Sequence, residues 1–92
     1  MIRAFVLYDG EPDSQLCDEH VEVCRAVPGA TFRHGRVFGA PMGEHEHRYY
    51  AEFEWPDLDA FKAAARSPEF AETGRHAQEL GVPFSVEFAD VG

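Results

Sequence analysis

The stretch from Asp13 to Gly29, DSQLCDEHVEVCRAVPG, carries the clearest helical pattern of the chain. Its apolar residues recur at i, i+7, i+8 and i+11, which is one stripe of an amphipathic helix. The stripe consists of Leu16, Val23, Cys24 and Val27. His20 falls inside it, one helical turn from both Leu16 and Cys24, so we expect the helix to turn one imidazole toward the interior of the domain.

Two interpretations of this inward imidazole compete. In the first, His20 is a core histidine whose ring is satisfied by a backbone carbonyl, as buried polar groups usually are. In the second, His20 lines a cleft between the helix and a sheet, where an imidazole can bind a ligand or exchange a proton. The sequence pattern alone is compatible with both.

Four segments around this helix have the alternation of strands: 1–8, 31–38, 47–55 and 82–89. The third alternates most clearly, with Tyr49, Ala51, Phe53 and Trp55 on one face. The aromatic residues of these segments, Phe32, Phe38, Phe53, Trp55, Phe84 and Phe88, are predicted to belong mainly to the core.

Two further helices are predicted between the third and fourth strands. Asp57 can cap a helix with Leu58, Phe61 and Ala65 at helical spacing. A second helix restarts at Ser67-Pro68, with serine as the cap and proline in the first turn. Its inner face is expected to consist of Phe70, Thr73, Ala77 and Leu80.

The resulting order, βαββαβ, predicts an α+β fold of the ferredoxin-like type: four antiparallel strands with the helices on one face. We expect residues 1–92 to form a single domain. The other sheet face would carry Phe5, Leu7 and Tyr50 among arginines and glutamates. Because such a face would leave apolar side chains exposed, we expect it to pack on a second copy, as an isologous homodimer.

Composition limits the classes of partner. Lys and Arg number 8 against 17 Asp and Glu, a net charge of −9, which disfavours nucleic acid and anionic membranes. No apolar run of about 18 residues predicts a membrane span, and the opening residues do not have the pattern of a signal peptide. We therefore expect a cytoplasmic protein. Cys17 and Cys24 would lie about 10 Å apart along a helix, too far for a disulfide.

Three segments together resemble the EthD-like family of the dimeric α+β barrel superfamily. They are the opening strand MIRAFVLY, the segment HVEVCRAVPG with His20 eight residues before Pro28, and the block HRYYAEFEWPDLDAFKAAARSPEF. The resemblance implies a ferredoxin-like protomer whose sheet packs on its twin, with a cleft between sheet and helices. The superfamily includes cofactor-free monooxygenases, isomerases, polyketide cyclases and haem-handling proteins, and the EthD branch is associated with the degradation of organic ethers. His20 is the residue that matches a family position.

The predicted function is that of a small-molecule catabolic protein that binds or transforms an apolar or aromatic compound by oxidation or isomerisation. His20 is the candidate catalytic residue, positioning or deprotonating the substrate. The candidate substrate-binding residues are Tyr8, Tyr49, Trp55 and Phe84. The alternative is a non-catalytic ligand-binding or accessory protein that serves a separate oxygenase.

We expect no cofactor and no physiological metal. Phosphate-binding glycine motifs are missing from the sequence. The HxH run at His45 and His47 could supply two metal ligands, but it lies in a predicted loop where such side chains are normally solvated. Haem binding would need His20 or His34 to reach the iron in an open pocket. Glu52 and Glu54 form a carboxylate pair that we assign to ion pairs with Arg3 or Arg48 across the dimer interface.

Overall fold

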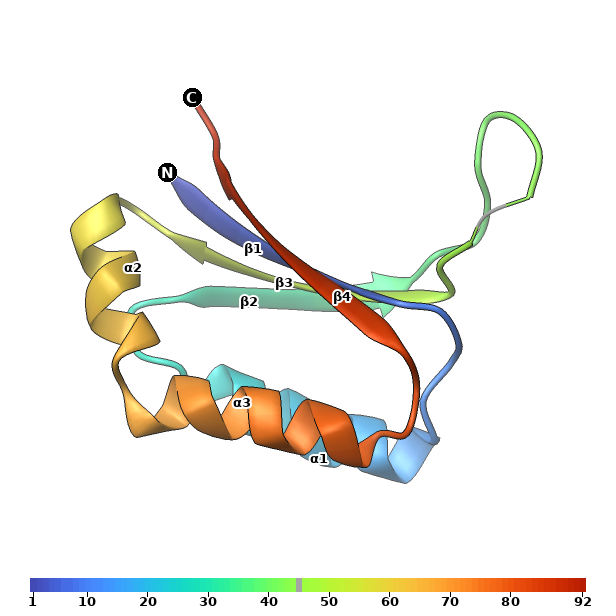
Figure 1. Ribbon diagram of the computed structural model, residues 1–92, viewed down its shortest axis with the longest axis horizontal. Coiled ribbons are helices and arrows are strands. Elements are labelled where there is room, and N and C mark those ends of the chain that lie inside the picture. The colour runs from blue at the N-terminus through green and yellow to red at the C-terminus, as the bar shows by residue number, and fades with distance from the viewer. Residues whose placement is uncertain (45) are drawn as a thin grey trace.

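The sheet is antiparallel throughout and has the strand order β2-β3-β1-β4 (Figure 1). A computed structural model describes residues 1–44 and 46–92. Its elements along the chain are β1 (Ile2–Tyr8), α1 (Ser14–Arg25), β2 (Thr31–Arg36), β3 (Tyr49–Trp55), α2 (Leu58–Ala65), α3 (Pro68–Glu79) and β4 (Phe84–Asp90). The order βαββαβ, with its second helix broken in two, confirms the predicted ferredoxin-like fold.

Strand alternation places the core on one face of the sheet. In β1, Ile2, Ala4, Val6 and Tyr8 are buried, whereas the residues between them are only partly buried. Their partners in β3 follow the same parity, because Ile2 pairs with Trp55 and Tyr8 pairs with Tyr49. Helices α1 and α3 lie next to each other beneath this face, as Figure 1 shows.

The helix starts follow from capping side chains. The Asp13 carboxylate accepts hydrogen bonds from the backbone N–H groups of Gln15 and Leu16. Asp57 caps α2 in the same way, and Ser67 caps α3 with Pro68 in the first turn. The caps at Asp57 and Ser67 confirm the prediction from the sequence, and all three caps fix where each helix begins against the sheet.

The strand ends differ from the prediction. β2 stops at Arg36, β3 begins at Tyr49, and residues 38–44 project from the sheet (Figure 1). Phe38 therefore lies beyond the strand and is 99% exposed, so its assignment to the core is wrong. Phe88 lies on the helix-facing parity of the edge strand β4 and meets the ring of Phe61 of α2, but it is 57% exposed, so its assignment to the core is also wrong.

The face opposite the helices carries ion pairs and half-buried apolar side chains. Arg3 lies 2.8 Å from Glu54, and Arg33 lies 3.9 Å from the same carboxylate. Phe5 and Leu7 from β1 are partly exposed here. Glu54 thus pairs with Arg3 within one protomer rather than across an interface as expected, because the two residues face each other on the paired strands β1 and β3. None of the helices among the described residues is long and apolar enough to cross a bilayer.

Candidate active site

His20 lies at the centre of a small buried polar cluster on α1. Its ring is 6% exposed, and its Nε2 lies 3.3 Å from the Tyr8 hydroxyl and 3.4 Å from the Cys24 thiol. Cys24 follows His20 by one helical turn, and Tyr8 ends β1 on the face that α1 covers. The inward orientation predicted for His20 is therefore present, and side chains rather than a backbone carbonyl engage its ring.

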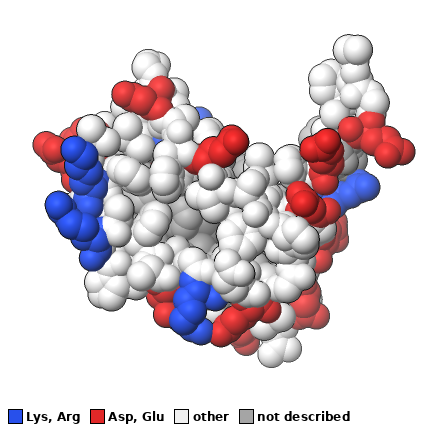
Figure 2. Space-filling view, viewed as in Figure 1, with Lys and Arg blue, Asp and Glu red and all other residues white. Residues whose placement is uncertain are grey.

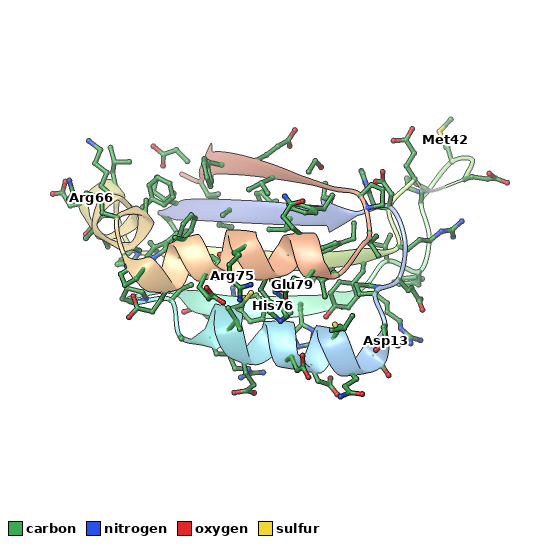
Figure 3. All side chains as sticks on the ribbon, turned by 60° about the horizontal axis from the view of Figure 1, so that its bottom comes forward. Asp13, Met42, Arg66, Arg75, His76 and Glu79 are labelled. Atoms are coloured by element: carbon green, nitrogen blue, oxygen red, sulfur yellow. The ribbon has the colours of Figure 1, made fainter. Side chains whose placement is uncertain are left out.

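The second ring nitrogen of His20 meets another histidine. His20 Nδ1 lies 2.9 Å from Nδ1 of His76 on α3, and the two rings stack with centroids 5.1 Å apart. His76 is 6% exposed and lies between α3 and α1, as Figure 3 shows. Sequence reasoning missed this partner. A signal was present, because His76 falls between Thr73 and Ala77 on the buried stripe of α3.

His20, Cys24 and Tyr8 are uncharged at neutral pH. Burial, and secondarily the neighbouring His76, lowers the pKa of His20 to about 4. Burial also raises the pKa of the Cys24 thiol to about 12 and raises the pKa of Tyr8 above its ordinary value. The site thus offers a neutral imidazole, a phenol and a thiol in a region poor in water.

A cavity of about 110 Å³ adjoins this cluster, between the sheet and α3. Its volume is of the same order as that of apolar cavities that hold a benzene ring, roughly 150 Å³. Small residues create the space, namely Ala4, Ala51, Gly74 and Ala77. Aromatic side chains from β3, β4 and α3 complete the wall. Figure 2 shows that the face over this region is largely uncharged, with Asp, Glu, Lys and Arg toward its margins.

The structure brings together three of the five predicted site residues around the cavity. His20, Tyr8 and Phe84 all line it. Trp55 lies elsewhere: it is 0% exposed, packs against Phe61 at 5.1 Å between ring centroids, and donates its indole N–H to the Pro28 carbonyl. Trp55 therefore belongs to the filled part of the core.

Tyr49, the remaining predicted residue, lies beside Tyr8 but outside the cavity wall. The two rings meet edge to face at 5.7 Å. The Tyr49 hydroxyl accepts a hydrogen bond from the Cys17 thiol at 3.2 Å and is hydrogen-bonded to Nδ1 of His34. Burial and the bond with Cys17 raise the pKa of Tyr49. This phenol faces a surface groove lined by Cys17 and His34 rather than the cavity beside His20.

No group of three potential metal ligands gathers within residues 1–44 and 46–92. His47 lies 3.1 Å from the Asp9 carboxylate, and the other histidine of the HxH run, His45, lies outside the described residues. Both cysteines are free.

No protein-family model and no curated protein sequence matches the chain. Solved structures do share its fold. An ethyl tert-butyl ether D (EthD) family protein from Bacillus halodurans is 24% identical, with a TM-score of 0.81, over 100% of this chain and 99% of that one. A dimeric ferredoxin-like protein of unknown function from Jannaschia is 19% identical, with a TM-score of 0.76 and 98% of both chains covered. A hydroxynitrile lyase from Passiflora edulis is 13% identical, with a TM-score of 0.76, over 99% of this chain and 93% of that one.

At these identities the likeness shows the fold alone. The fold implied by the resemblance of the sequence to the EthD-like family is confirmed, because an EthD family protein and a dimeric ferredoxin-like protein are among the structures that share it.

Proposed function

We propose that this protein binds a small cyclic organic compound with an ionisable hydroxyl or an enolisable carbonyl, and that His20 takes a proton from it. Proton removal of this kind begins an isomerisation or a cofactor-free oxidation. The observation that carries the proposal is the pairing of an apolar, ring-sized cavity with one polar corner, where His20 and Tyr8 meet.

The chemistry of the corner suits such a ligand. His20 is neutral at pH 7 because its pKa is about 4, so one of its nitrogens has a lone pair that can accept a proton. Tyr8 keeps its proton because its pKa is raised, and its hydroxyl can donate to a carbonyl or enolate oxygen. Base and donor lie 3.3 Å apart, close enough to serve neighbouring atoms of one small ring.

Some proteins of similar fold have names that refer to small organic molecules. One of the three is named a hydroxynitrile lyase, and another belongs to a family named for ethyl tert-butyl ether. These names support a small organic ligand as a class, and the choice of a ring with an ionisable group rests on the cavity of this chain.

The second candidate function is ligand binding without chemistry, as in an accessory protein of a separate oxygenase. The low pKa of His20 favours it, because an imidazole with a pKa of about 4 is a weak base at pH 7. In that case His20 would only orient the ligand by a hydrogen bond.

Phenol and anisole test the binding site directly. Both contain a six-membered ring, but only phenol can donate a hydrogen bond to His20. We expect phenol to bind roughly two- to tenfold more tightly, the range that one hydrogen bond contributes. The preference should vanish in His20→Phe, as measured by NMR titration of each variant. Equal affinity of the wild-type protein for both compounds would contradict the proposal.

A cavity-blocking variant controls for binding elsewhere on the protein. Gly74 is exposed at the rim of the cavity, and a Cβ built at this position meets no atom within 4 Å. Gly74→Leu should therefore keep the fold, place its side chain at the mouth of the cavity and weaken the binding of both compounds alike. Unchanged binding in this variant would show that phenol occupies another place.

We further propose that the protein forms a homodimer through the face of the sheet that the helices leave uncovered. Phe5 and Leu7 lie there, half-buried and without a covering layer in the protomer. Light scattering should give twice the protomer mass of 10.3 kDa. Leu7→Arg should give the single mass, whereas Leu58→Arg, on exposed α2, should not. A wild-type monomer at micromolar concentration would contradict this assembly.

A further inference from the structure

His76 connects the buried cluster to the protein surface. On one side its Nδ1 meets His20 at 2.9 Å, and on the other its Nε2 lies 3.8 Å from the carboxylate of Glu79. The Glu79 side chain is 49% exposed, whereas His76 is buried. Figure 3 shows His76 and Glu79 on the same helix, near the seam between α3 and α1. A chain of titratable groups thus runs from the cavity through His20 and His76 to solvent.

The carboxylate decides which nitrogens carry protons. Two neutral histidines that share an Nδ1–Nδ1 contact need one N–H and one lone pair between them. If His76 donated, its Nε2 lone pair would face the Glu79 carboxylate, which is unfavourable. If His20 donates, His76 presents an N–H to Glu79, and His20 presents a bare Nε2 to Tyr8 and the cavity.

We propose that His76 and Glu79 form a proton outlet for the cavity. Glu79 fixes the tautomers so that Nε2 of His20 is the base, and His76 receives the proton that leaves Nδ1. This inference rests on the proposed function, since it gives the route by which the proton taken from the ligand reaches solvent. It assigns His76 and Glu79 as positioning residues and His20 as the group that touches the ligand.

The transfer conserves protons and charge. A proton enters His20 at Nε2 while the proton on Nδ1 passes to His76 Nδ1. His20 stays neutral and only changes tautomer, and the ligand becomes an anion. The positive charge resides on His76, beside the Glu79 carboxylate, rather than on the desolvated ring at the cavity. The weak basicity of His20 is therefore no barrier, because His20 never has to hold the charge.

The charged neighbours of the outlet lie on α3 itself. Arg75 donates to Glu79 at 2.5 Å and is also hydrogen-bonded to Glu72. Glu72 interacts electrostatically with His76 but makes no ion pair with it. From β1 and α1 the groups facing His20 are Tyr8 and Cys24, both uncharged at pH 7. Glu72 is therefore a matched control for Glu79. Both carboxylates form an ion pair with Arg75, but only Glu79 lies within 4 Å of the His76 ring.

The first test measures tautomers in the ligand-free protein by 15N NMR of the histidine rings at pH 7. We expect His20 to be protonated at Nδ1 and bare at Nε2 in the wild-type protein and in Glu72→Gln. In Glu79→Gln the two tautomers should become mixed, because the anion that selects one of them is gone. Identical tautomer populations in all three proteins would overturn the outlet.

The second test follows the proton itself, with cyclohexanone as the probe. Incorporation of solvent deuterium beside its carbonyl should be catalysed by the wild-type protein and by Glu72→Gln, and should fall by at least roughly tenfold in Glu79→Gln. Equal rates in the two variants would overturn the outlet while leaving His20 as the base. If the wild-type protein does not exchange deuterium faster than buffer alone, the proposed proton transfer is wrong. The outlet then has no proton to carry, whichever tautomers the histidines adopt.

Discussion

The two ends of the layer between sheet and helices are packed differently. At the end where Ile2 pairs with Trp55, the indole is 0% exposed and contacts the rings of Phe53, Phe61 and Phe70. Toward the other end, where Tyr8 pairs with Tyr49, the layer has an apolar hollow with one polar corner, formed by His20 and Tyr8. The Trp55 end is therefore filled and serves stability, whereas the Tyr8 end retains space that can hold a ligand.

Residue size explains the contrast. Large rings interdigitate at the Trp55 end, where dispersion and burial are both favourable. Alanine and glycine line the cavity, so the sheet and α3 enclose a space that their side chains do not fill. The groups that meet this space, His20 and Tyr8, are hydrogen-bonded and neutral, which keeps the cost of their burial low.

The largest effect should come from emptying the filled end. Trp55→Ala removes a fully buried indole and should lower the free energy of unfolding by about 3–5 kcal/mol. Trp55→Phe retains a ring and should cost clearly less. Urea unfolding at pH 7 measures both. A loss below about 1 kcal/mol for Trp55→Ala would mean that this end is not the stabilising one.

The next effect concerns pH and the hollow end. The folded pKa of His20, about 4, lies below the ordinary value of 6.5, so between these values the unfolded chain binds a proton that the folded chain does not. Stability should therefore fall as the pH drops from 6.5 toward 4, by about 3 kcal/mol. Above pH 6.5 His20 adds no pH dependence.

Urea unfolding across this range should show the loss in the wild-type protein and a flatter profile in His20→Phe. Equal slopes in the two proteins would show that other groups govern the acid sensitivity.

The smallest effect comes from narrowing the mouth of the cavity. Gly74→Ala adds a methyl group on the exposed rim, where a Cβ meets open space, and replaces a poor helix former in α3. The free energy of unfolding should rise by about 1 kcal/mol, and phenol should bind more weakly. Thermal unfolding and the phenol titration measure the two changes, and a destabilised variant would contradict the open space assigned to this position.

Much of the fold could be predicted because local signals decide it. Asp57 and Ser67 mark helix starts by their capping oxygens, and the alternation of 49–55 marks the face that is buried. Phe38 shows the limit of this reasoning. Its predicted burial assumes that the strand continues past Arg36, but the last residue pair of β2 is Arg36 with Tyr49. Beyond that pair the chain leaves the sheet, and strand alternation no longer determines which side chains are buried.

The site was harder to predict because it depends on depth and on tertiary contact. Strand alternation predicts that Trp55 and Tyr8 lie on the same face of the sheet. It does not predict that they lie at opposite ends of the layer between sheet and helices. His76 lies 56 positions from His20, and only the packing of α3 against α1 brings the two rings together. The helical spacing of Thr73, His76 and Ala77 could have predicted that His76 points inward, but it could not have predicted the contact with His20.

The most direct test of the account is an NMR titration of the His20 ring with pH in the ligand-free protein. Burial between α1, α3 and the sheet should hold this imidazole neutral. We expect a midpoint near pH 4, with the ring uncharged at pH 6. A midpoint near the ordinary 6.5 would mean that water reaches the ring freely, and it would contradict both the neutral cluster and the ligand site built on it.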